Sequence, residues 1–308
     1  MKARIAVVAR SRMRARRWAG LAGLVLSISA CGGQAGAPPP SASTSAAPAT
    51  AAAAPAVTIA PSASPSRAPS VSARSTADRV DDFSGPQVHF MYVLPSDGVD
   101  ESLDTNGRIT NAISAVQTWL GGQTGGRKLR VDRAAGAPDI TFFRLSASDA
   151  SISASGAFVR DRIEAELKAA GFNAAGKIYA VYYGGGSTYA CGGGAWPPTL
   201  PGIVAAQYLK GTPPGAFPCA NNPVGANPAG PGYEEFAILH EVLHTIGIVA
   251  TCAPHHTRAG HTSDDPRDLM YAGDQPWRPS ILDVGHDDYY GHAIPGCANL
   301  ATSPYLMP

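Results

Sequence analysis

The sequence predicts an α/β (α+β) fold: a mixed twisted sheet with two helices, a third helix that is buried, and an irregular, disulfide-stapled C-terminal part. Between residues 87 and 183, strand-like apolar segments alternate with helix-like patterns. Residues 234–246 are apolar on nearly every side of a helix, which is typical of a buried helix. Residues 191–231 are rich in glycine and proline, and little regular structure is predictable after Gly247.

The predicted elements follow one another along the chain with short connections. Residues 87–94 have the pattern of a buried strand, and 107–120 place apolar side chains at helical spacing before two glycines. Two short strands, a second helix and another buried strand are then expected, at 128–131, 139–145, 157–170 and 177–183. Within the glycine-rich loop, 203–208 is one further strand candidate.

The N-terminal region has the composition of a targeting segment and a tether. Residues 1–31 combine scattered basic residues, a short apolar run and an Ile-Ser-Ala-Cys sequence that resembles a bacterial lipobox, which predicts a lipid anchor on Cys31. Ordinary signal-peptide cleavage, giving a secreted protein, is the alternative, and Met13 would be a more usual start. Residues 32–84, rich in Ala, Pro and Ser, are predicted to be a disordered tether, and 85–308 to be the folded domain.

Charge and size narrow the class of protein. The formal net charge is +1, which gives no reason to expect a nucleic-acid partner. The folded part of roughly 220 residues is long enough for one domain with a sizeable core. We therefore expect a monomeric, exported domain held at the outer face of the cell membrane by its lipid.

Four cysteines remain if Cys31 is acylated, an even number suited to an oxidising compartment. Proximity along the chain favours the pairs Cys191–Cys219 and Cys252–Cys297 among the three pairings that four cysteines allow. A zinc-thiolate site is the alternative, but the close Cys-x-x-Cys spacing of such sites is missing.

The segment His240-Glu241-Val242-Leu243-His244-Thr245-Ile246-Gly247 carries the chemistry. Residues four apart lie on one face of a helix, so His240 and His244 can present two imidazoles to one metal ion. Glu241 lies beside that face, where a carboxylate can act as a base toward water. Gly247 stands where the helix should end. The pattern predicts a hydrolytic zinc site with Glu241 as the catalytic base.

The motif and a downstream Asp268-Leu269-Met270-Tyr271 resemble the metzincins, a clan of zinc endopeptidases. The resemblance implies a zincin-like fold, one catalytic Zn²⁺ on His240 and His244, Glu241 as general base, and Met270 in a methionine turn beneath the metal. The region from Gly232 to Tyr305 also resembles secreted or lipoprotein zincins of actinobacteria.

One position departs from the metzincin pattern. The family takes its third ligand three residues after the glycine, where this chain has Ala250. We therefore expect the third ligand from a loop that returns toward the helix. His261 is the first choice, since it falls in a loop approaching the methionine turn and has Asp264 and Asp265 nearby as acceptors; His256, and then His255 or a carboxylate, are the alternatives.

The tail at 282–292 is dense in polar groups. It has three interpretations: a tyrosine, Tyr289 or Tyr290, that donates to an oxyanion; a calcium site from Asp283, Asp287 and Asp288; or a capped turn with solvated carboxylates. No role is assigned to these residues.

The expected activity is hydrolysis of a peptide or protein substrate, with the substrate lying along 203–208 as an added strand. Two other functions remain open. The first is a non-catalytic zinc-containing envelope lipoprotein that binds a cell-wall or protein partner, which the alanine at 250 motivates. The second is a zinc amidase acting on peptidoglycan, which the expected location motivates.

Overall fold

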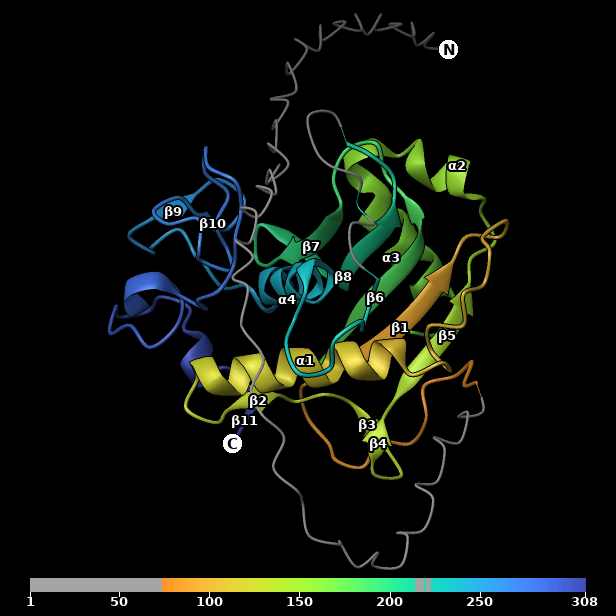
Figure 1. Ribbon diagram of the computed structural model, residues 1–308, viewed down its shortest axis with the longest axis horizontal. Coiled ribbons are helices and arrows are strands. Elements are labelled where there is room, and N and C mark those ends of the chain that lie inside the picture. Colours follow the sequence, from red (N-terminus) through yellow and green to blue (C-terminus); the bar gives the residue numbers. More distant parts are fainter. Residues whose placement is uncertain (1–73, 214–218, 220–222) are drawn as a thin grey trace, which may run out of the picture.

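The computed structural model describes residues 74–213, 219 and 223–308 (Figure 1). The predicted signal peptide, the lipid anchor on Cys31 and most of the tether lie outside these residues and stay predictions. No helix of the described part is long and apolar enough to span a bilayer.

A five-stranded mixed sheet forms the centre of the fold and confirms the predicted fold class. Its order is β5-β1-β6-β8-β7. The first four strands are parallel and the last, β7, is antiparallel to β8. Their bounds are β1 Gln87–Leu94, β5 Ile140–Arg144, β6 Lys177–Gly186, β7 Gly192–Trp196 and β8 Leu200–Lys210.

Helices cover both faces of this sheet (Figure 1). Alternate residues of β1 enter two different cores: Phe90 packs in the cluster with α1 and α4, and Met91 in the cluster with α3. This period of two is the reason that the parallel strands are apolar throughout. The helices are α1 Arg108–Gln123, α2 Asp149–Ser153, α3 Val159–Ala169 and α4 Tyr233–Ile246.

The remaining elements are short and mostly belong to the connections. Three two-stranded pairs join β2 with β11, β3 with β4, and β9 with β10. Their bounds are β2 Lys128–Leu129, β3 Arg133–Ala134, β4 Ala137–Pro138, β9 His256–Thr257, β10 His261–Thr262 and β11 Leu306–Met307. Three single-turn 3₁₀ helices lie at Gly156–Phe158, Val284–His286 and Leu300–Thr302.

The structure corrects three details of the predicted elements. The strand at 203–208 belongs to β8, which lies between β6 and β7 and is not an edge. Strand β7 was missed because three of its five residues are glycine. Helix α1 continues through its two glycines to Gln123, because the tertiary contacts of its apolar face outweigh their weak helix propensity.

Residues 74–84, which the sequence assigned to the tether, lie against the domain. The Ser75 carbonyl accepts a hydrogen bond from Phe142 at the β5 edge. Arg79 pairs with buried Asp139 at 2.7 Å, and Asp78 pairs with Lys177 at 2.7 Å. The ordered domain therefore includes residues before the expected boundary at 85, since charged side chains of this segment have partners in the domain.

Both favoured disulfides are present. Cys191–Cys219 joins the start of β7 to the loop after β8, and Cys252–Cys297 joins the segment after α4 to the C-terminal tail. The second bond closes a sequence separation of 45 residues in the loop-built region. It limits the paths open to the segment that follows α4.

Candidate metal centre

Helix α4 is fixed at both ends before its histidines are considered. Glu235 accepts hydrogen bonds from the amides of Gly232 at 2.8 Å and Gly225 at 2.7 Å, so one carboxylate caps the first turn and holds the preceding loop. Gly247 ends the helix with a φ of 88°, the left-handed conformation that glycine adopts easily. These ends set where His240 and His244 stand relative to the sheet.

Three imidazole nitrogens converge beside this helix. The Nε2 atoms of His240 and His244 are 3.0 Å apart. The Nε2 atom of His261, which opens β10, lies 3.2 Å from that of His240 and 3.1 Å from that of His244. The structure thus brings together the three histidines that the sequence put forward as a ligand set.

The tautomers of the His240 and His261 rings show which of their nitrogens are free to bind a metal ion. His240 Nδ1 donates to the Leu269 carbonyl at 2.7 Å, and His261 Nδ1 points to the Arg258 carbonyl at 3.4 Å. Their Nε2 atoms therefore carry lone pairs that face one another, which is unfavourable unless a cation lies between them. Nitrogens bound to tetrahedral zinc are about 3.3 Å apart, close to the observed separations. The donor set fits a metal ion.

Burial favours the neutral, metal-binding form of the rings. Desolvation lowers the pKa of His240 to about 4 and that of His261 to about 3, and it also lowers the pKa of His244. All three imidazoles are neutral at neutral pH. The buried Nδ1 of His244 has no hydrogen-bond partner among the residues described.

The side chain of Glu241, which belongs to α4, lies between this helix and the edge strand β7. A Cβ atom built on Gly192 would come within 2.4 Å of the Glu241 carboxylate, and one on Gly194 within 2.8 Å of the His244 Cβ. The glycines therefore allow β7 to approach the helix where a side chain would prevent it. Desolvation raises the pKa of Glu241 to about 8, against the opposing effects of Arg160 and the Gly194 amide. The run of three glycines at 192–194 is the only sign of this contact in the sequence.

The other two candidate histidines have different partners. The His256 ring stacks on Trp196 with centroids 5.5 Å apart, and its Nδ1 lies 3.1 Å from the Val249 carbonyl. His255 lies 3.1 Å from the buried carboxylate of Asp288. Neither ring takes part in the three-histidine group.

Met270 is fully buried in the turn that follows the third histidine. Its carbonyl accepts from the Thr262 amide at 3.0 Å, which joins the turn to the residue after His261. Its amide donates to Asp268 at 2.7 Å. The turn contacts the site through the neighbouring Leu269 carbonyl, and that backbone contact has no signal in the sequence.

The tail tyrosines point into the protein. Tyr289 is buried and donates from its hydroxyl to Asp268 at 3.0 Å, and Tyr290 donates to the Thr124 carbonyl at 3.1 Å. Asp283 accepts from the amides of both tyrosines, at 2.8 and 2.6 Å. These bonds favour the interpretation of the tail as a capped structural turn rather than as an oxyanion site.

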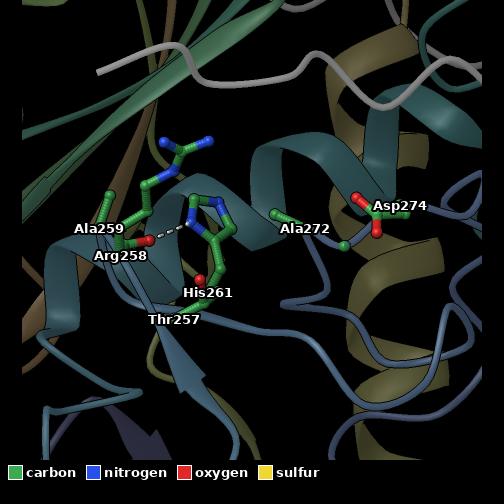
Figure 2. Close-up of a pocket in the computed structure, with 7 residues that line it drawn as sticks. Thr257, Arg258, Ala259, His261, Ala272 and Asp274 are labelled. Carbon is green, nitrogen blue, oxygen red and sulfur yellow. Dashed lines mark hydrogen bonds between the residues drawn. The ribbon is translucent and has the colours of Figure 1, made fainter. Parts of the chain in front are cut away.

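A small pocket opens beside the third histidine. Figure 2 shows His261 with Arg258 and Ala259 on one side and Ala272 and Asp274 on the other. Charged groups of both signs line it, so side chains of a bound molecule would meet polar walls next to the metal centre.

The comparisons with known proteins do not assign a function to this chain, so a functional assignment depends on the geometry of the site. No protein-family model matches the chain, and no curated protein matches it in sequence. Among solved structures, the chain overlaps a chaperone-substrate complex at 15% identity and a TM-score of 0.29, covering 67% of this chain and 34% of that one. It overlaps metalloproteinase-II from Bacteroides fragilis at 15% identity and a TM-score of 0.28, covering 67% and 52%. The chain thus spans about a third and about half of these structures, and likeness this low carries no argument about activity.

Proposed function

We propose that this protein is a zinc-dependent peptide hydrolase whose metal is held by His240, His244 and His261. The observation that carries the proposal is the convergence of three imidazole Nε2 atoms within 3.2 Å of one another beside a desolvated carboxylate. Three neutral imidazoles with a fourth position open are the donor set of catalytic rather than structural zinc.

The chain's own groups divide the work of the reaction. Zn²⁺, when bound, would supply Lewis acidity toward water and the scissile carbonyl. The Glu241 carboxylate accepts the proton of the attacking water and delivers it to the nitrogen of the leaving amine. In the metal-free protein desolvation raises the pKa of Glu241, so its carboxylate holds a proton more readily than an exposed glutamate does. His240 and His261 are oriented by the backbone carbonyls that their Nδ1 atoms contact.

We expect the substrate along β7 rather than along residues 203–208, which belong to β8. Strand β7 is the last of the five, and within the described residues no strand lies on its outer side. An extended peptide added there would run past Glu241 and His244, which contact the β7 glycines. A scissile bond of such a peptide would lie beside the candidate base.

Replacing Glu241 by glutamine tests the mechanism. The E241Q variant should bind one zinc per chain, as the wild type does, and lose peptide turnover by about 100-fold or more, because a general base contributes on that scale. The matched control is E101Q, which changes an exposed glutamate far along the chain. Turnover by E241Q at the wild-type rate would remove Glu241 from the mechanism.

A digest of a peptide library and of muropeptides, with and without chelator, separates the three functions under consideration. Chelator-sensitive cleavage of ordinary peptides supports the hydrolase proposed here. Cleavage of muropeptides alone supports a zinc amidase. Bound zinc without any cleavage supports a non-catalytic envelope protein. Attachment through Cys31 stays a prediction, to be checked by mass analysis of the mature N-terminus.

A further inference from the structure

Trp277 lies across the same face of α4 that carries the first histidine. Its ring packs edgewise against His240, with centroids 5.7 Å apart, and against Tyr233, at 5.8 Å. These two partners are seven residues apart, two turns along one helix face. The indole therefore covers one side of the His240 ring and limits the directions in which it can tilt.

The indole also reaches the group that orients His240. Its Nε1 donates at 3.2 Å to the carbonyls of both Asp268 and Leu269. The Leu269 carbonyl is the acceptor for His240 Nδ1 at 2.7 Å. The Leu269 carbonyl oxygen thus accepts a hydrogen bond from the Trp277 indole N–H and one from the His240 imidazole N–H.

The turn that carries this carbonyl is held on its other side by a buried carboxylate. Asp268 accepts from the Met270 amide at 2.7 Å, the Val284 amide at 2.9 Å and the Tyr289 hydroxyl at 3.0 Å. The carboxylate fixes the backbone of the turn, and the indole acts on its carbonyls. Both are needed to set the direction of the Leu269 oxygen.

We propose that Trp277 is a positioning residue of the metal centre, which fixes the tautomer and tilt of His240 through the Leu269 carbonyl. This inference rests on the proposed metal site but names a residue outside the ligand set and outside the motif. A hydrogen-bonded carbonyl keeps the proton on Nδ1 and leaves Nε2 free to bind. Groups that orient a ligating histidine in this way typically account for 10- to 100-fold in metal affinity, so about 10-fold is expected for loss of the indole N–H.

The test compares W277F with W119F in the full chain. Phenylalanine at 277 keeps an aromatic ring against His240 but removes the N–H donor. Trp119 packs edgewise on Phe236 at 5.0 Å and is not an aromatic neighbour of the three histidines in the described part of the chain, so W119F is the matched control. Zinc affinity is measured by chelator competition, and the visible absorption spectrum of the Co²⁺ form reports ligand geometry.

W277F is expected to bind zinc about 10-fold more weakly than wild type and to shift the Co²⁺ spectrum, while W119F does neither. Wild-type affinity and spectrum in W277F would overturn the inference. If W277F does not fold, W277Y, which also lacks the indole N–H, is measured in its place. Failure of the wild type itself to bind zinc would instead overturn the proposed function, so the two failures are distinguishable.

Discussion

At the scale of single residues, the candidate metal centre depends on which ring nitrogen of each histidine carries the proton. Backbone carbonyls select this nitrogen for His240 and His261, because each carbonyl can accept only from a protonated Nδ1. The choice leaves the Nε2 lone pairs of His240 and His261 directed toward each other and toward His244. A bound cation would remove the resulting repulsion, and desolvation favours the neutral form of the rings that a metal needs.

Alanine substitutions of the three loop histidines should affect metal binding unequally. H261A is expected to weaken zinc binding by more than about 100-fold, beyond the effect of losing an orienting group, because it removes a direct donor. H255A and H256A should keep the wild-type stoichiometry, since those rings contact Asp288 and Trp196 instead. Metal analysis of the three purified variants checks this. Full zinc content in H261A would exclude it as a ligand.

Acid should destabilise the metal-free protein through the same rings. The folded-state pKa values of His240 and His261, about 4 and about 3, lie below the unfolded value of about 6.5. As the pH falls from 6.5 toward 4, the unfolded chain takes up protons that the folded chain does not. Stability is therefore lost in this window, by at most about 1.4 kcal/mol per pH unit for each histidine.

Urea unfolding of chelator-treated protein between pH 7 and pH 5 measures this loss. The H261A variant should show a shallower dependence on pH, since it has one fewer depressed imidazole. Equal slopes in the two proteins would mean that His261 titrates normally in the metal-free fold.

At the scale of elements, the site is formed where α4 passes the edge strand β7. The helix supplies His240, Glu241 and His244 from neighbouring positions, and β7 can lie against them only because residues 192 and 194 are glycine. The parallel strands beside it hold β7 in place through its antiparallel pairing with β8. Helix α4 thus provides the functional side chains, and the backbone of β7 packs directly against them.

A methyl group added to the strand should disturb this contact. In G194A the new Cβ would lie 2.6 Å from the Glu241 carbonyl oxygen and 2.8 Å from the His244 Cβ, so β7 or α4 must shift. We expect a loss of roughly 1–3 kcal/mol in unfolding free energy, as in other overpacked sites, together with weaker zinc binding.

The matched control for G194A is G122A. Nothing lies within 4 Å of a Cβ built on Gly122 in α1, and alanine there should raise the unfolding free energy by about 0.5 kcal/mol. Urea unfolding and chelator competition on both variants measure the difference. Unchanged zinc binding and stability in G194A would show that β7 can move away from the helix at no cost.

At the scale of the whole molecule, covalent and ionic contacts hold the two ends of the described chain against the sheet. The C-terminal tail is tied to the segment after α4 by Cys252–Cys297. At the other end, Lys177 on β6 contacts Asp78 and Asp81 of the leading segment and buried Asp132, each within 2.7 Å. Burial opposes the charge of Lys177, but these carboxylates outweigh it and raise its pKa.

Removing the charge of Lys177 should therefore destabilise the domain. In K177M, the side chain of buried Asp132 keeps only the His89 ring, at 2.7 Å, among its described side-chain partners. We expect a loss of about 3 kcal/mol in unfolding free energy, as for other buried pairs that lose one partner. R267M, which breaks the exposed pair of Arg267 with Asp265, should not change stability measurably. Urea denaturation of both variants decides this, and equal midpoints would contradict a structural role for the Lys177 cluster.

Features that depend on local chain geometry could be predicted from the sequence. The motif helix, its glycine end and the pairing of two histidines with Glu241 follow from the helical repeat, and the buried strands at 87–94 and 177–183 follow from their apolar composition. The two disulfide pairs followed from spacing along the chain. The helix and strands depend on residues near one another in sequence, whereas the cysteine pairs, 28 and 45 residues apart, were favoured only as the nearest partners along the chain.

Features that depend on how distant parts of the chain pack together could be seen only in the tertiary structure. Three loop histidines were available, and the structure places His261 at the centre because the β9–β10 turn returns it to α4. It also made β7 the edge strand, and it brought Trp277 and the Leu269 carbonyl to His240 through contacts between residues 29 or more apart. Such contacts are set by the packing of the whole domain, and no repeat of two or 3.6 residues encodes them.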